Sequence, residues 1–429
     1  MVDLMSVVKE GFSFCREVEA VQHERYMYDL GVPQHWQKQT GIGIRVNHRG
    51  RLGFAWSEGQ FPPSEQLRQA AKNALQGPEG DFSVHRPIAA ESFTSGFNPD
   101  ASVKAMERLV QELRFILPTF MPERSFTINA QLVRDVFTIA NRRGTQRDVR
   151  IAHLITLRSP QNPPILAASY TTAPPKNPDF LLCQLLWRHS HSRSVALPQN
   201  DTVPAFFSAE AAAQFWHDCI QSHWINHSGT ACRPFSCNSG ISVYEDGGLP
   251  SALGVTHIDG EGLPRQRLPL IDKGRTVNTL YDTISARRVN REILGTSIRY
   301  WGCPPQAGYT NLDIMPGQHT SSQLCKEMAN GIWLDYLTPL PDAAPPGVFQ
   351  RRASIAFLVE KGRPVARLPQ FIVQGRYQDM LNGSFIGLGC EARLHGRIQA
   401  PVMAVDRLRL FKKELSPQEG SLDLPHLWW

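Results

Sequence analysis

The residues that come closest to acid–base chemistry by type and spacing are two carboxylates in a glycine-rich turn. Asp259 and Glu261 lie within the stretch Gly254–Pro264, and a glycine follows each of them. Two carboxylates this close together could act as an acid/base pair. Glycine accepts backbone angles that other residues resist, and proline ends regular pairing, so such carboxylates more often form the turn or its salt bridges. We therefore expect an acidic turn here, with catalysis by the pair as the less favoured interpretation.

The candidate metal ligands are histidines on one predicted helix, which begins at Ser208. His223 and His227 are four residues apart, so on a helix they would share a face and could both reach one Zn²⁺. His217 lies on the flank of that face, and Asp218 follows it. A structural helix is the favoured interpretation, and zinc binding by His217, His223 and His227 is the alternative. The reason is that the same face carries residues expected to pack in the core, namely Ala212, Trp216, Cys219 and Ile220.

The composition is typical of a globular protein with a substantial core. The chain has 429 residues, of which 41% are hydrophobic and 20% charged, and its net charge is +6. Its Lys and Arg residues form no dense block, so we expect no nucleic-acid partner. No apolar run approaches the ~18 residues of a membrane span, and the N-terminus does not resemble a signal peptide. The eight cysteines are scattered, which favours free thiols. We expect a cytoplasmic protein with no membrane partner.

Hydrophobic periodicity predicts both helices and strands in the N-terminal part. Alternating residues over Gly41–Ala55 predict a β-hairpin. Two helices should follow, the first capped by Ser64 and ended by Gly77, and the second capped by Asp100. The opening segment Leu4–Tyr26 has loose helical spacing.

From Phe126 onward the hydrophobic period changes to two, which predicts strands. Asn141–Gly144 should form the turn between two of them. Further along, Asp272–Gly274 lies between two apolar runs, as is typical of a hairpin. The strands predicted in the middle of the chain are Phe126–Val133, Val136–Ala140, Val149–Leu157 and Ile165–Thr171.

These elements predict an α+β fold. We expect an N-terminal α/β domain with a hairpin and helices, followed by a strand-rich C-terminal β domain. The expected boundaries are residues 1–120 for the N-terminal α+β domain, 121–205 for a middle strand-rich region and 206–429 for the C-terminal β-rich domain.

Five stretches, taken in order, resemble the TldD/PmbA family of peptidase-associated proteins. The third stretch begins at Asp259 with the sequence Asp-Gly-Glu-Gly-Leu-Pro, which is similar to the family's Asp-x-Glu-Gly-x-Pro. The family's middle region likewise has an Asn-containing turn ending in glycine. The five stretches are Gly41–Ala55, Asn141–Gly144, Asp259–Val277, the pair Gly295–Tyr300 with Asn311–Gly317, and Gly396–Val402.

The family has two kinds of member, and this chain resembles the kind without zinc. TldD-type members carry His-Glu-x-x-x-His on a helix plus a distant cysteine, whereas TldE (PmbA)-type members lack this site and pair with a TldD-type subunit. The matching helix here has His217 and Asp218, but His223 comes one place too late. Asp218 replaces the glutamate that would act as general base, and Cys390 stands in a different context from the usual third ligand. The resemblance therefore implies no catalytic residue and no cofactor in this chain, with zinc in the partner subunit.

The resemblance also implies a function. The chain would pair with a TldD-like metallopeptidase and help to hold an extended, unfolded peptide, including leader segments of ribosomally made, modified natural products. The candidate substrate-binding residues are Asp259, Glu261, Gly262 and Arg299. Two alternatives stay open: a stand-alone zinc peptidase that uses the histidine-bearing helix, and a peptide-binding module without an enzymatic partner.

Overall fold

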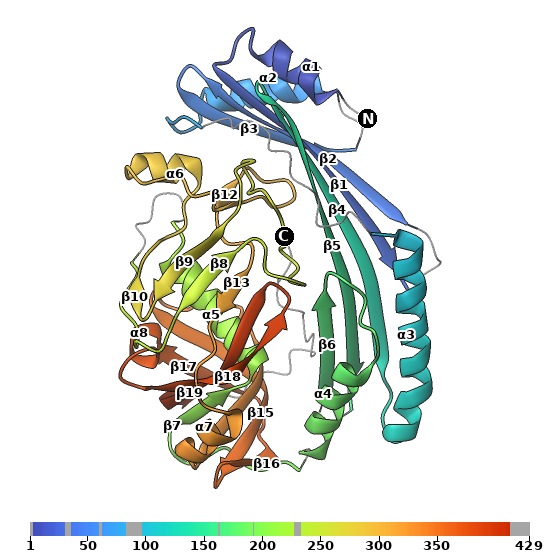
Figure 1. Ribbon diagram of the computed structural model, residues 1–429, viewed down its shortest axis with the longest axis vertical. Coiled ribbons are helices and arrows are strands. Elements are labelled where there is room, and N and C mark those ends of the chain that lie inside the picture. The colour runs from blue at the N-terminus through green and yellow to red at the C-terminus, as the bar shows by residue number, and fades with distance from the viewer. Residues whose placement is uncertain are drawn as a thin grey trace.

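The computed structural model describes residues 3–30, 36–59, 62–82, 97–161, 164–191, 193–226 and 233–411. Two large β-sheets, with helices around them, make up most of this part of the chain (Figure 1). The predicted α+β class and the strand-rich C-terminal part are confirmed.

Six antiparallel strands form the first sheet, in the order β3-β2-β1-β4-β5-β6. β2 and β3 are the predicted hairpin, whose turn holds Arg49 and Gly50 at positive φ. The predicted turn Asn141–Gly144 joins β4 to β5, and β6 spans the residues expected of it. The bounds are β1 (Glu17–Asp29), β2 (Gln37–His48), β3 (Arg51–Glu58), β4 (Thr127–Asn141), β5 (Gly144–Ser159) and β6 (Ile165–Thr171).

Two N-terminal predictions were wrong in extent. The helix expected over Leu4–Tyr26 covers only α1 (Leu4–Gly11), because the chain from Glu17 onward becomes β1 and pairs with β2 and β4 on its two sides. Tertiary pairing overrides weak helical spacing here. β4 runs unbroken where two strands were expected, because Asp135 is buried and paired with Arg25 of β1 instead of ending the strand.

The four N-terminal helices cover one face of this sheet. α1 and α2 (Pro63–Ala74) pack on one end, and α3 (Pro99–Phe120) and α4 (Asp179–Ser190) on the other. Ala140 and Ala130, which contact these two helix pairs, are ten residues apart on β4 and therefore point to the same side of the sheet.

Both predicted N-caps were displaced by two residues. The first helix is capped by Pro62 instead of Ser64. The second is capped by Asn98 instead of Asp100, and the Asn98 side chain accepts a hydrogen bond from the Ala101 amide at 3.1 Å. In each case a proline, Pro63 or Pro99, occupies the first turn of the helix. Proline suits this position because its φ is already helical and it has no N–H to leave unsatisfied. Ser208 does cap the third predicted helix, α5 (Ala209–His223).

The second sheet has eleven strands and curls on itself. Its path is β10-β9-β8-β13-β19-β17-β15-β14-β7, and β16 pairs with β15 and β18 with β19. Because β7 also pairs with β19, the last five strands of the path form a closed ring. α5 packs against this ring with Phe215 and Trp216 in the main core. The predicted hairpin at Asp272–Gly274 is confirmed.

The remaining bounds in the C-terminal part are β7 (Thr202–Phe207), β8 (Val243–Asp246), β9 (Arg267–Asp272), β10 (Arg275–Thr276), α6 (Thr283–Arg288), β11 (Ser297–Ile298), β12 (Gln306–Ala307), β13 (Leu312–Ile314), α7 (Ser321–Met328), β14 (Gly331–Thr338), β15 (Val348–Glu360), β16 (Arg363–Arg367), β17 (Phe371–Arg376), α8 (Tyr377–Met380), β18 (Phe385–His395) and β19 (Ile398–Phe411).

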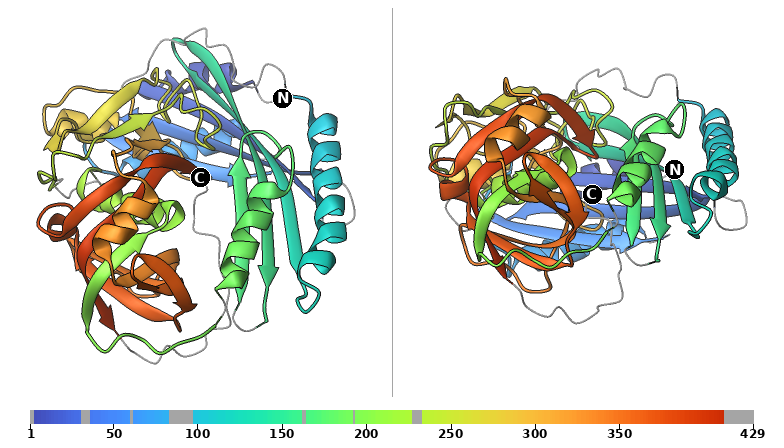
Figure 2. Two further views of the ribbon diagram at one scale, coloured as in Figure 1. Left: turned by 60° about the horizontal axis from the view of Figure 1, so that its bottom comes forward. Right: turned by 90° about the horizontal axis from the view of Figure 1, so that it is seen from below.

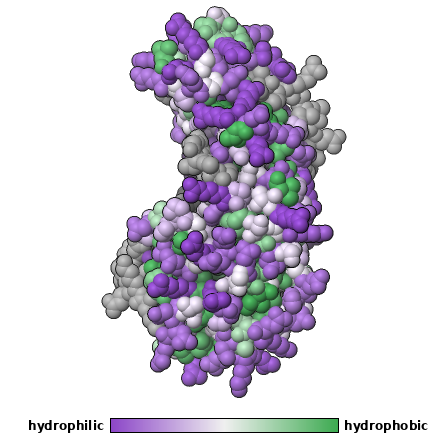
Figure 3. All heavy atoms as spheres, turned by 90° about the vertical axis from the view of Figure 1, so that its left-hand side faces the viewer, coloured by the Kyte–Doolittle hydropathy of each residue, from purple (hydrophilic) through white to green (hydrophobic). Residues whose placement is uncertain are grey.

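The C-terminal part lies against the face of the first sheet opposite the helices (Figure 2). On the side of the molecule shown in Figure 3, hydrophilic side chains predominate and hydrophobic ones gather in small patches. Among the described helices, none has the length and apolar character needed to span a membrane.

Candidate functional site

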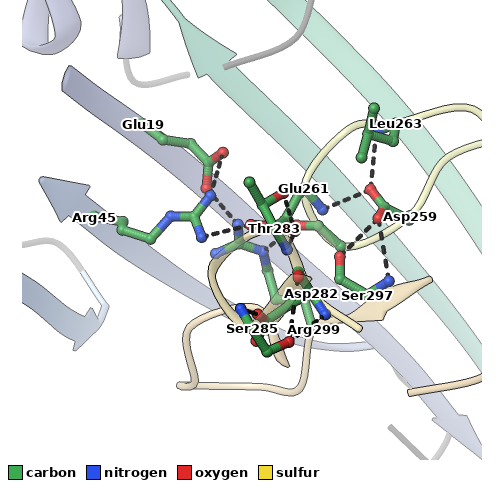
Figure 4. A network of polar contacts seen from close by, with 11 residues as sticks. Glu19, Arg45, Asp259, Glu261, Leu263, Asp282, Thr283, Ser285, Ser297 and Arg299 are labelled. Atoms are coloured by element: carbon green, nitrogen blue, oxygen red, sulfur yellow. Dashed lines mark hydrogen bonds and ion pairs between the residues drawn. The ribbon is translucent and has the colours of Figure 1, made fainter. Parts of the chain in front are cut away.

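Asp259 organises the turn in which it lies. Its Oδ1 accepts hydrogen bonds from the amides of Glu261 at 2.9 Å and Leu263 at 2.8 Å. Its Oδ2 accepts from the amide of Ser297 at 3.1 Å and from the Ser297 hydroxyl at 2.9 Å (Figure 4). Both oxygens are thus engaged by the protein itself. The positive φ of Gly262, +81°, completes the turn that wraps around this carboxylate.

Glu261 points away from Asp259 toward the first sheet. One of its oxygens lies 2.9 Å from a guanidinium nitrogen of Arg45, on β2. The other accepts hydrogen bonds from the amide of Thr283 at 2.8 Å and from the Thr283 hydroxyl at 2.7 Å. Glu261 therefore joins the start of α6 to the N-terminal sheet.

Two arginines and Glu19 complete this buried network. Glu19, on β1, pairs with Arg45 at 3.2 Å and with Arg299 at 2.5 Å. Arg299 also donates from Nε to the carbonyl of Gly260 at 3.1 Å. Figure 4 shows these side chains converging between the first sheet and the acidic turn. The attraction between alternating buried charges offsets the cost of removing them from water, and each charge depends on its partners remaining in place.

The charges of the network set the pKa values of its carboxyls. Burial raises the pKa of Glu261, but the charge and hydrogen bonds of Arg45, together with those of Thr283, outweigh it and lower that pKa. Burial and the neighbouring Glu261 carboxylate raise the pKa of Asp259 to about 6. The two carboxyls thus differ because only Glu261 has a direct arginine partner.

The network lies inside the molecule. Asp259, Glu261 and Arg299 are 2%, 1% and 4% exposed. The geometry therefore supports a role in holding the acidic turn against the N-terminal sheet, and it offers no free carboxylate oxygen of Asp259 for proton transfer. Direct contact of these residues and Gly262 with a substrate stays a prediction.

The histidine-bearing helix α5 places its polar residues in separate contacts. Nδ1 of His217 is hydrogen-bonded to the hydroxyl of Tyr309. Asp218 forms a two-pronged ion pair with Arg351, at 2.7 Å and 2.5 Å. Nδ1 of His223 lies 3.1 Å from the carbonyl of Arg233. Six residues separate His217 and His223, so they lie on different sides of the helix.

These residues do not fit a zinc ion. Burial lowers the pKa of His217 to about 4; the charge of Asp218 acts in the opposite direction, and the charges of Arg397 and Arg351 add to the effect of burial. A dication beside this imidazole would meet the same two guanidinium charges. Within the described residues, no three His, Cys, Asp or Glu side chains are grouped so that they could hold a metal ion. His227, the third histidine of the predicted alternative, lies outside the described residues.

Glu19, Arg45, Thr283 and Ser297 belong to the network but were not singled out from the sequence. Arg45 alternates with Ile44 and Val46 in a predicted hairpin, so the sequence indicates only that it faces the other side of the sheet. Glu261 and Arg299, which lie on that side, come more than two hundred positions later. No local signal could have identified the pairing.

Comparison with known proteins agrees with this architecture. Residues 235–411 match the family model described as the PmbA/TldA metallopeptidase C-terminal domain. No curated protein sequence matches the chain.

Three solved structures share its fold over 95% of its length. TldE from Thermococcus kodakarensis is 16% identical, with a TM-score of 0.73 and 100% of that chain covered. A protein of Thermotoga maritima named as a proposed modulator of a DNA gyrase is 15% identical, with a TM-score of 0.74 and 100% covered. A Bacteroides thetaiotaomicron protein with a similar name is 12% identical, with a TM-score of 0.72 and 97% covered. With the family model over residues 235–411, these findings confirm the predicted resemblance to the TldD/PmbA family.

Proposed function

We propose that this chain is a TldE-type, non-catalytic subunit that pairs with a TldD-like zinc metallopeptidase to bind and help cleave unfolded peptides. The observation that carries the proposal is that the polar side chains of α5 are already bonded to other residues of this chain. At the position where a TldD-type helix would present histidine and glutamate to zinc, His217 is bonded to Tyr309 and Asp218 to Arg351.

The two subunits have different roles in this proposal. A zinc ion activates water and polarises a peptide carbonyl, and in this proposal the partner subunit supplies it. The residues of this chain then serve to position elements. The network around Glu261 fixes the acidic turn and the start of α6 relative to the N-terminal sheet, so that the pair of subunits presents one pre-formed surface.

An extended peptide is the substrate class that suits such a strand-rich subunit. Peptide main chain can add to a sheet edge as an extra strand, which demands little of the peptide's sequence. Leader segments of ribosomally made, modified natural products are unfolded peptides of this kind, and they are the proposed natural substrates.

Co-expression with a TldD-like protein from the same genome tests the proposal. We expect the two chains to co-purify and the complex to hydrolyse an unfolded peptide, with the activity removed by a chelator. The complex should lose activity when the partner's His-Glu-x-x-x-His glutamate is changed and keep it when His217 of this chain is changed to Gln.

Two results would contradict the proposal. Hydrolysis by this chain alone, blocked by a chelator and by His223→Ala, would make it a stand-alone zinc peptidase. Peptide binding without any association with a TldD-like chain would make it an independent binding module.

A further inference from the structure

A cavity of about 580 Å³ lies where β6 ends partway along β5. The last residue pair between the two strands is His153 with Thr171. Pro174 and Pro175 follow, and proline cannot donate to a strand ladder. Figure 1 shows β5 continuing well beyond the end of β6. Among the described strands, residues 144–152 of β5 pair only with β4.

The register shows which backbone groups point toward this cavity. On the outer edge of β6, the Ala168 amide donates to Gln184 at 3.1 Å, and Arg188 donates to the Leu166 carbonyl. Hydrogen-bonding direction alternates along a strand, so the odd-numbered residues of β6 face β5. The pairing of Thr171 with His153 then makes the odd-numbered residues of β5 face β6. Beyond His153, the backbone groups of Ile151 and Val149 therefore point along the same open edge.

Four segments wall the cavity, and one of them is the stretch Thr172–Pro174 directly after β6. The first turn of α3 contributes Asn98, Ala101 and Ser102, and the loop after β8 contributes Pro250 and Leu253. The floor is β5, with Val149, Ile151 and His153. Most of this lining is apolar, and Arg150 is the charged side chain among the described lining residues. Such a site favours an apolar group and disfavours a cation.

His153 is the polar group in this site that calls for a ligand. Its side chain is 1% exposed, and neither ring nitrogen has a hydrogen-bond partner of good geometry. Burial lowers the pKa of His153 to about 4, although weak hydrogen bonding to the backbone of Thr171 and Thr172, outside good geometry, acts in the opposite direction. The ring is therefore neutral at pH 7 and can donate from one nitrogen and accept at the other. Buried polar groups are nearly always hydrogen-bonded, so a partner is expected here.

We propose that this cavity binds an extended peptide segment, whose main chain pairs with Val149 and Ile151 along the line of β6 and whose aromatic hydroxyl-bearing side chain reaches His153. The inference rests on the peptide-binding part of the proposed function and names the binding site on this subunit. The open edge supplies the main-chain recognition, the apolar walls accept the ring, and His153 selects the hydroxyl.

Calorimetric titration of the full chain with two capped peptides, acetyl-Ala-Tyr-Ala-amide and acetyl-Ala-Phe-Ala-amide, tests the site. We expect saturable binding of both, with the tyrosine peptide bound roughly tenfold more tightly, as one added hydrogen bond predicts. Methylation of the tyrosine amide nitrogen should weaken binding, because it removes a donor needed for strand pairing.

Two pairs of variants locate the binding. Ala101→Phe should fill the mouth of the cavity and abolish binding, whereas Arg108→Phe, at an exposed position of the same helix outside the cavity, should leave it unchanged. His153→Leu should make the tyrosine and phenylalanine peptides bind equally, and His153→Gln should restore the preference.

The proposal is overturned if neither peptide binds saturably or if Ala101→Phe binds as Arg108→Phe does. A tyrosine preference that survives His153→Leu would remove His153 from the site. Co-purification with a TldD-like chain is measured separately, so a failed cavity with intact pairing is distinguishable from failure of the proposed function.

Discussion

Arg45 and Glu261 are 216 residues apart in the chain, yet a guanidinium nitrogen of Arg45 lies 2.9 Å from a carboxylate oxygen of Glu261 in the interior. Arg45 is on the second strand of the N-terminal sheet, and Glu261 is in the acidic turn of the C-terminal part. Glu19 bonds to the opposite side of Arg45 and to Arg299, so the four charges alternate. This relationship makes the acidic turn a structural joint between the two parts of the chain.

Removing the charge at this joint should destabilise the protein strongly. Glu261→Gln leaves Arg45 buried with only Glu19 as its partner, and loss of one member of a buried pair costs about 3–5 kcal/mol. Urea unfolding of the variant measures this loss. The exposed pair Arg51–Glu79 offers a control, and Glu79→Gln should leave the unfolding midpoint unchanged. A Glu261→Gln protein as stable as the wild type would refute the structural role.

The turn around Asp259 should be sensitive to the backbone angle of Gly262. Its φ of +81° is unfavourable for any residue with a Cβ, and a Cβ there would lie 3.2 Å from the side-chain oxygen of Gln146. We expect Gly262→Ala to cost about 1–2 kcal/mol of unfolding free energy. Gly383→Ala is the matched control, since an added Cβ there meets nothing within 4 Å and its φ is not positive. Equal losses in the two variants would argue against strain at Gly262.

Restoring the TldD-type sequence motif on α5 should not create a zinc site. The double variant Asp218→Glu, Ser222→His restores His-Glu-x-x-x-His in sequence. His217 is nevertheless held by Tyr309, and Arg351 remains to pair with the new carboxylate and to repel a dication. We expect no zinc above background after dialysis against zinc and then buffer, measured by elemental analysis. One zinc per chain in the double variant would show that the nearby arginines do not prevent zinc binding.

Acid should weaken the protein partly through Asp135. Burial alone would raise the pKa of Asp135, but hydrogen bonds and charge from Arg25 and His23 hold it at about 2. The unfolded chain has an aspartate pKa of about 3.9, so the folded state binds this proton more weakly. Asp135 therefore contributes about 2 kcal/mol of stability above pH 4, and that contribution is lost as the pH falls from about 4 to about 2.

Unfolding free energies of the wild type and Asp135→Asn, measured from pH 7 to pH 3, check this. The difference between them should be constant above pH 5 and should shrink below pH 4. Asp272→Asn, at an exposed position, should follow the wild type at every pH. A difference that does not change with pH would separate the loss of stability from the ionisation of Asp135.

Local chemistry in the sequence was enough to predict several elements. The hairpin at β2 and β3, the turn Asn141–Gly144, the strand β6 and the cap Ser208 were predicted because each depends on residues close together in the chain. Hydrophobic alternation and turn residues act over a few positions, so a sequence alone can reveal them. The acidic turn of Asp259 was likewise recognised as a turn from its glycines.

Tertiary structure decided what these elements do. β1 was predicted as helix because its spacing looked helical locally, whereas its strand state depends on pairing on both sides, and its partners on β4 lie more than a hundred residues away. The joint formed by Glu19, Arg45, Glu261 and Arg299 exists only when the C-terminal part covers the N-terminal sheet. His153 lies within the predicted strand Val149–Leu157, and only the end of β6 beside it leaves it lining a cavity. Burial and charge pairing depend on which surfaces meet, and the fold alone brings those surfaces together.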